Sequence, residues 1–101
     1  MKTIEWASGL FEGEGTIVQN AAGTNYLQIT MVDEDVIDMF GATVGRGKKY
    51  QLSPLKSGKD VWRWSIHRKE DVRNVLSRML PHLGNRRAHR ALDALDNIEL
   101  N

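Results

Sequence analysis

Two glutamates, Glu12 and Glu14, stand among glycines at the end of an expected first helix, where acidic side chains are unusual. Thr3 can cap this helix, which we expect over residues 4–13. A helix C-terminus is the negative end of the helix dipole and disfavours a carboxylate by typically about 0.3–1 kcal/mol. The acids therefore indicate a cation, and a hard divalent ion such as Mg²⁺, Mn²⁺ or Ca²⁺ prefers oxygen ligands. The alternative is two solvated acids in a turn.

The same helix carries apolar or small residues on two opposite faces. One face holds Ile4, Ala7 and Phe11, and the other holds Trp6, Gly9, Leu10 and Gly13. A surface helix normally shows one apolar stripe, so something else must cover the second face. Gly9 and Gly13 each cost about 1 kcal/mol in a helix interior unless close backbone approach compensates. A second copy of the chain, packed across a twofold axis, is the simplest such cover, and it would bring two Glu14 carboxylates together.

The sequence predicts one α+β domain over residues 1–101, and its other helices and strands must position the end of the first helix. Strands of two hairpins are expected at residues 16–20, 26–31, 48–52 and 61–67. The remaining segments are helical. Gly13 and Gly15 end the first helix, Asp33 caps a second that Gly41 or Gly45 closes, Pro81 ends a third, and the last buries Ala88, Ala91, Leu92, Leu95 and Ile98. This order predicts an αββαββα fold, a four-stranded antiparallel sheet with helices on one face.

Composition limits the possible functions. The chain has 101 residues, of which 41% are hydrophobic, and this suits one domain with one core. Because it has no cysteine, disulfides, thiolate zinc sites and a cysteine nucleophile are excluded, so any metal must use carboxylates or histidines. No segment approaches the roughly 20 apolar residues that span a bilayer, and no secretory signal is visible. We expect an intracellular protein without membrane contact.

Charge is unevenly distributed along the chain. The net charge is only +1, yet residues 46–90 hold thirteen of the fourteen lysines and arginines against three acids, which gives that segment about +10. Such a segment attracts a polyanion such as DNA through phosphate contacts and counterion release. A merely solvated basic surface is the alternative.

The expected strands alternate between an apolar and a polar side. In the last strand Trp62, Trp64 and Ile66 oppose Arg63, Ser65 and His67, and in the second strand Leu27 and Ile29 oppose Tyr26, Gln28 and Thr30. One face of the sheet therefore belongs to the core. The other face is polar and basic, and it could be solvated without binding any ligand.

Residues 6–17, Trp-Ala-Ser-Gly-Leu-Phe-Glu-Gly-Glu-Gly-Thr-Ile, resemble the signature segment of the LAGLIDADG homing endonucleases. Variants of that segment often end in Gly-Glu-Gly followed by a small hydroxyl residue and isoleucine. Residues 80–86, Leu-Pro-His-Leu-Gly-Asn-Arg, resemble the family's Pro-x-Leu-x-x-Lys segment before the last helix. The resemblance implies a saddle-shaped sheet on double-stranded DNA, signature helices forming the core of a homodimer, and a metal-binding acid at each helix end.

The resemblance also implies roles for individual residues. The metal-binding acid falls on Glu14, with the Gly13 carbonyl beside it, and the active-site lysine falls on Arg86. Glu12 lies about 160° around the helix from Glu14, so we expect it to orient the helix end. The dimer contact falls on Trp6, Gly9, Leu10 and Gly13, and candidate contacts to bases or phosphates in the major groove are Asn20, Gln28, Lys48, Arg63, Ser65 and His67. A homodimer predicts a near-palindromic target.

Two alternatives stay open beside a metal-dependent, site-specific double-strand DNA endonuclease. Met31 stands where relatives commonly have a polar residue near the active-site water, and Arg86 replaces a lysine. These departures fit a catalytically inactive DNA-binding protein of the same fold, resembling a maturase or a transcription regulator. The second alternative is an interaction module whose glycine-containing helix merely dimerises.

Overall fold

The computed structural model of the chain describes residues 2–19, 24–52 and 58–100. Its helices are α1 (Ile4–Glu14), α2 (Glu34–Val44), α3 (Lys69–Met79) and α4 (Asn85–Leu100), with a short 3-10 turn, η1 (Leu80–His82), between the last two. Its strands are β1 (Gly15–Gln19), β2 (Asn25–Met31), β3 (Lys48–Leu52) and β4 (Val61–Ile66). The expected order αββαββα is confirmed, with Pro81 inside the turn that separates α3 from α4.

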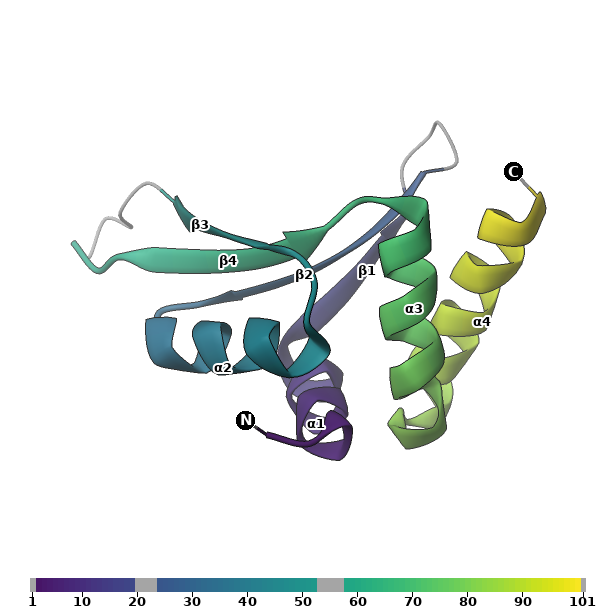
Figure 1. The fold of residues 1–101 in the computed structure, drawn as a ribbon, viewed down its shortest axis with the longest axis horizontal. Helices are drawn as coiled ribbons and strands as arrows, with labels where there is room; N and C mark the ends of the chain where they lie inside the picture. The colour runs from purple at the N-terminus through teal and green to yellow at the C-terminus, as the bar shows by residue number, and fades with distance from the viewer. Residues whose placement is uncertain (1, 20–23, 53–57, 101) are drawn as a thin grey trace.

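The strands form one antiparallel sheet in the order β1-β2-β4-β3, so β2 and β4 are central and the two hairpins lie side by side. The helices lie on one side of this sheet and leave the other side uncovered (Figure 1). Gln28 is paired with Ser65, which in turn is paired with Lys48, and Thr30 is paired with Arg63. The expected division of the sheet into a core face and a polar face is therefore confirmed.

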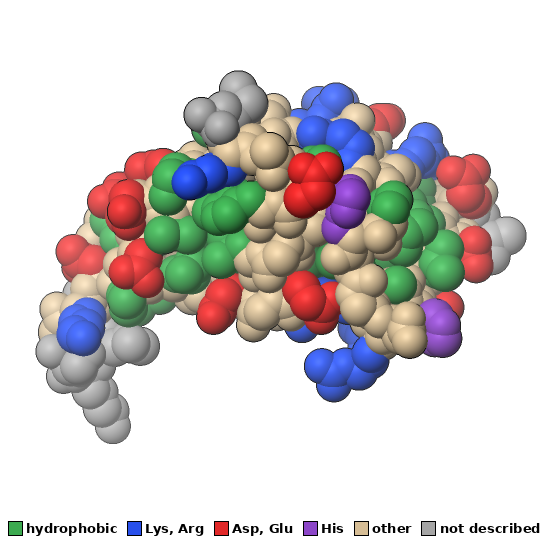
Figure 2. Space-filling view, turned by 90° about the horizontal axis from the view of Figure 1, so that it is seen from below, with side chains coloured by type: hydrophobic (Ala, Val, Ile, Leu, Met, Phe, Trp, Pro, Cys, Tyr) green, Lys and Arg blue, Asp and Glu red, His purple; other side chains and the backbone are tan. Residues whose placement is uncertain are grey.

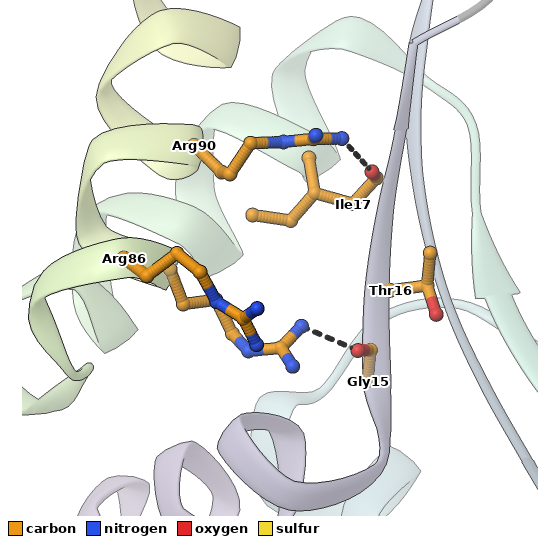
Figure 3. A pocket seen from close by; sticks show the side chains of 6 residues that line it. Gly15, Thr16, Ile17, Arg86 and Arg90 are labelled. Atoms are coloured by element: carbon orange, nitrogen blue, oxygen red, sulfur yellow. Dashed lines mark hydrogen bonds between the residues drawn. The ribbon is translucent and has the colours of Figure 1, made fainter.

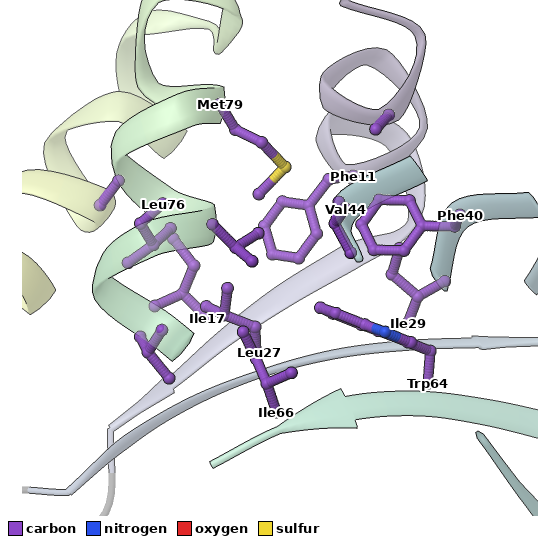
Figure 4. Close-up of a cluster of buried hydrophobic side chains, with 14 of the residues drawn as sticks. Phe11, Ile17, Leu27, Ile29, Phe40, Val44, Trp64, Ile66, Leu76 and Met79 are labelled. Carbon is purple, nitrogen blue, oxygen red and sulfur yellow. The ribbon is translucent and has the colours of Figure 1, made fainter. Parts of the chain in front are cut away.

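The core lies between the sheet and the helices and is built around three aromatic rings (Figure 4). Phe40 of α2 meets Trp64 of β4 edge-on, with their ring centroids 4.7 Å apart, and Phe11 of α1 lies 6.5 Å from Phe40. The indole N–H of Trp64 donates to the Arg46 carbonyl at 2.8 Å, which satisfies its polar group inside the core. Phe11 thereby ties α1 to the centre of the domain.

The start of α1 is as expected, and its end lies one residue later than expected. The Thr3 hydroxyl accepts a hydrogen bond from the Trp6 N–H at 3.1 Å, which confirms the cap. The helix continues one residue further than expected, to Glu14, so Gly13 lies within it, whereas Gly15 ends it as expected. Gly15 has extended backbone and begins β1. A Cβ built at Gly15 would lie 2.2 Å from the Phe11 ring, so glycine is required by close packing.

Substitution Gly15→Ala should therefore destabilise the domain. Overpacking of this kind typically costs about 1–3 kcal/mol, and each kcal/mol lowers the melting temperature of a domain this size by about 4–8 °C. Thermal unfolding followed by circular dichroism measures the change. A melting temperature equal to that of the wild type would show that the Phe11 ring can move aside without loss.

The other helices differ from expectation in detail. Gly45, in the left-handed region at φ 75°, closes α2, and Gly41 lies within that helix. Asp33 precedes α2, but no cap hydrogen bond from its side chain is formed. Leu92 was expected in the buried stripe of α4, yet it is 46% exposed, because Ala91, Ala94 and Ile98 supply the contact. No helix in the described part of the chain is long and apolar enough to cross a membrane.

Candidate functional site

One face of α1 is packed in the core and the opposite face is open. Ala7 and Phe11 are fully buried, whereas Gly9 and Gly13 are exposed. A Cβ built at either glycine would meet no atom of the described residues within 4 Å. Trp6 and Leu10, which were expected on this face, are half-buried. Figure 2 shows the side of the molecule on which α1 and α2 lie, where hydrophobic side chains reach the surface between acidic ones.

Glu14 is the last residue of α1 and its side chain is exposed. The last carbonyls of a helix have no partner within it, so the Gly13 carbonyl and the Glu14 carboxylate offer hard oxygen ligands at the same helix end. This donor set suits Mg²⁺, Mn²⁺ or Ca²⁺. Within the described residues of one chain, no three histidine, aspartate or glutamate side chains are grouped around a possible metal position. The other ligands of such an ion would have to come from water, a phosphate or a second copy.

Glu12 fastens the end of α1 to the entry into α4. One carboxylate oxygen of Glu12 accepts from the Gly84 N–H at 2.6 Å, and the other accepts from Nε of Arg87 at 3.3 Å. The Gly84 N–H and, after it, Arg87 hold the pKa of Glu12 below its usual value of 4.5. Glu12 thus faces α4 and is engaged there, as expected of a residue that orients the helix end.

The lowered pKa of Glu12 predicts a pH-dependent contribution to stability. Because the folded chain binds this proton less readily than the unfolded chain, the contribution is present above pH 4.5 and is lost as the pH falls through the lowered pKa. We expect Glu12→Gln to melt below the wild type at pH 7, with the difference shrinking towards pH 3. Parallel melting curves from pH 7 to pH 3 measure it. A difference that stays constant over this range would refute the contact with Gly84 and Arg87.

Two arginines of α4 donate hydrogen bonds to backbone carbonyls of β1. Nη1 of Arg87 donates to the Gly15 carbonyl at 2.5 Å, and Nη2 of Arg90 donates to the Ile17 carbonyl at 2.9 Å. Together with the exposed Arg86 they line an open pocket of about 400 Å³ against residues 15–17 (Figure 3). Arg86 therefore lies beside the residue that follows Glu14. Arg87 and Arg90 were not singled out from the sequence, although the spacing of residues 86, 87 and 90 puts them on adjoining sides of one helix.

The polar face of the sheet has a groove of about 630 Å³, and most of the residues expected to contact DNA line it. Its lining includes four of those candidates, Gln28, Arg63, Ser65 and His67, and also Thr24, Tyr26, Tyr50, Gln51 and Leu52. Lys48 is opposite Ser65 on the same face, and Asn20 lies outside the described residues. Ser65 is only 4% exposed, so it is the least accessible of these candidates.

Two side chains on this face are held by neighbours. Nε of Arg63 donates to the Thr30 hydroxyl at 3.1 Å, and the rings of Tyr26 and His67 stack with centroids 4.6 Å apart. Tyr50 is 45% exposed and was not among the residues expected to contact DNA, although strand alternation puts it on the same side as Lys48. The face therefore presents both hydrogen-bonding groups and flat rings.

No protein-family model and no curated protein sequence matches the chain. Solved structures do match. I-CvuI in complex with its target in the presence of Ca has a TM-score of 0.73 at 16% identity, over 95% of this chain and 65% of that one. I-CeuI complexed with DNA has a TM-score of 0.76 at 13% identity, over 96% of this chain and 54% of that one. The LAGLIDADG meganuclease I-CpaMI bound to uncleaved DNA has a TM-score of 0.72 at 16% identity, over 98% of this chain and 37% of that one. The chain has the LAGLIDADG homing-endonuclease fold.

The chain spans 65% of the length of I-CvuI, and a smaller share of I-CeuI and of I-CpaMI, which have the same LAGLIDADG fold. The end of α1 lies beside the second half of β2, because Gly15 is paired with Ile29. Met31, two residues further along β2, is half-buried against the core beside Trp62.

Proposed function

We propose that the chain is a site-specific double-strand DNA endonuclease that acts as a homodimer and hydrolyses phosphodiester bonds with a divalent metal ion. The observation that carries this proposal is the open Gly9/Gly13 face of α1, which ends in the exposed Glu14. A second copy packed on that face would bring two Glu14 carboxylates beside one axis. The fold supports the proposal, since I-CvuI, I-CeuI and I-CpaMI are all seen with DNA.

Glu14, with the Gly13 carbonyl, would hold the metal ion. Mg²⁺ is our first choice, with Mn²⁺ or Ca²⁺ as alternatives, and structures of I-CvuI were obtained with Ca and with Mg. A bound divalent ion supplies a Lewis acid for a phosphate oxygen and lowers the pKa of a bound water. The two like charges that dimerisation would gather also favour a cation there.

The remaining residues of the centre act by charge and position. A guanidinium carries a positive charge but is a poor proton donor or acceptor, so Arg86 would stabilise negative charge at the phosphate and would not transfer a proton. Glu12 holds the end of α1 against Gly84 and Arg87, and this contact keeps Glu14 and the start of α4 in a fixed relation. Glu12 is thus a positioning residue, and Glu14 and Arg86 are the catalytic residues of the proposal.

The polar face of the sheet would lie along the major groove of the duplex. Arg63 uses Nε on Thr30, which leaves its two outer nitrogens for the bidentate contact that arginine makes with guanine. Gln28 suits adenine in the same way, while Lys48 and His67 suit phosphates or base acceptors. Two such faces related by a twofold axis would read an inverted repeat.

Selection and cleavage of a random duplex library in Mg²⁺ tests the proposal. The expected result is metal-dependent double-strand cleavage at a near-palindromic sequence. Salt-sensitive binding to such a sequence without cleavage would favour the inactive DNA-binding protein, which is the alternative that methionine at position 31 also favours. Neither binding nor cleavage would leave only the interaction module.

A further inference from the structure

Three arginines of α4 gather in one pocket with little to balance their charge. Arg86, Arg87 and Arg90 line one wall of about 400 Å³ of open space, and residues 15–17 of β1 line the other. Among the described residues, Glu12 is the carboxylate that pairs with this group, through Arg87. Like charges held in one place repel each other, so the pocket is arranged for an anion.

Two of these guanidinium groups are already held in place. Arg87 donates to the Gly15 carbonyl and to Glu12, and Arg90 donates to the Ile17 carbonyl. A guanidinium has five N–H donors, so these contacts occupy two donors of Arg87 and one of Arg90. Side chains held in this way lose less conformational entropy when they bind a ligand.

Covering the edge of the sheet does not by itself require charge. β1 is an edge strand, and its outward carbonyls need only N–H donors, which uncharged groups can supply. Three cationic groups at this edge exceed that need. A planar guanidinium is, in contrast, well matched to the oxygens of a phosphate, which it binds in a bidentate manner.

The pocket adjoins both parts of the proposed DNA-binding surface. Gly15, in its wall, directly follows Glu14. The exposed Thr16 is paired with Gln28, and its side chain points away from the arginines, to the other side of β1 (Figure 3). A duplex lying on the polar face of the sheet and reaching Glu14 would therefore pass along this edge strand.

We infer that this arginine pocket binds a backbone phosphate of the duplex next to the phosphate that is cut, with Arg90 as its main contact. The inference rests on the proposed function for the identity of the ligand. It adds a second phosphate position on each subunit, separate from the metal-binding Glu14.

Substitution Arg90→Gln tests the inference, because glutamine keeps a polar side chain but removes the charge. The measured quantity is the affinity for a duplex as a function of KCl concentration, without Mg²⁺. Losing one phosphate contact per subunit should lower the slope of log affinity against log salt by about 0.9, or about 1.8 for a dimer. Arg90→Lys keeps the charge and should keep most of the slope. Arg73→Gln, which removes an arginine of α3 paired with Glu99, should leave the slope unchanged.

Titration of the free protein with inorganic phosphate tests the pocket without DNA. The expected result is saturable shifts of the amide resonances of residues 15–17 in the wild type and their loss in Arg90→Gln. Cleavage of DNA by the wild type, together with an unchanged salt slope and no such shifts, would overturn the pocket and leave the nuclease standing. Phosphate binding and a reduced slope without any cleavage would uphold the pocket and overturn the nuclease.

Discussion

Gly9→Leu should leave the subunit folded and prevent it from pairing with a second copy. A Cβ at position 9 meets no atom of the described residues within 4 Å apart from the local helix backbone, and leucine is about 1 kcal/mol better than glycine in a helix. If two α1 helices approach closely at their glycines, the leucine separates them. We expect self-association to weaken at least about a hundredfold, equivalent to about 2.8 kcal/mol. Sedimentation equilibrium measures the association and circular dichroism measures the fold.

Ser77→Leu is the matched control for this change. Ser77 is an exposed residue of α3, so leucine there adds similar bulk to a helix surface away from the Gly9/Gly13 face. The control should associate like the wild type. A Gly9→Leu protein that dimerises as well as the control would show that the open face of α1 is not the contact.

Glu14→Gln should abolish most metal-dependent cleavage while leaving DNA binding in place. The glutamine has the same shape, and the side chain is exposed, so the fold should not change. The neutral amide binds a hard cation more weakly than the carboxylate does, and removing a single electrostatic group from a catalytic centre typically costs about 10²–10³ in rate. We expect a loss of at least about a hundredfold in the rate of plasmid cleavage in Mg²⁺.

Glu5→Gln serves as the control for Glu14→Gln. Glu5 is another exposed acid of α1, at the opposite end of the helix, where it lies 3.8 Å from His82. Its substitution should leave the cleavage rate within about twofold of the wild type, as for most exposed surface changes. Equal rates for Glu14→Gln and the wild type would remove Glu14 from the proposed centre.

Much of the architecture follows from periodicity in the sequence. The alternation of residues 61–67 identifies Trp64 as a core residue and Arg63 as a residue of the polar face, and both positions are confirmed. The two-sided character of α1 also appears in the structure, with Phe11 buried and Gly9 open. These features are local, because side-chain direction depends on position within one element.

Long-range contacts could not be predicted in this way. Glycines were read as helix ends, yet Gly13 lies within α1, and Gly15 is required by the Phe11 ring. The hydrogen bond from Gly84 to Glu12 joins residues 72 positions apart, and only the packing of α4 against the end of α1 brings them together. In the same way, the limited exposure of Ser65 depends on neighbouring strands and not on its own strand's pattern.

The central claim is that two copies of α1 pack together and bring their Glu14 residues close to one axis. Because the chain has no cysteine, Glu14→Cys introduces a single site for a spin label. Continuous-wave line broadening, which reports short separations, and pulsed dipolar spectroscopy, which reports long ones, should together show one narrow distance in the DNA-bound protein, well below the 42 Å length of the subunit. A broad or absent dipolar signal, or a distance as long as the subunit itself, would contradict the account.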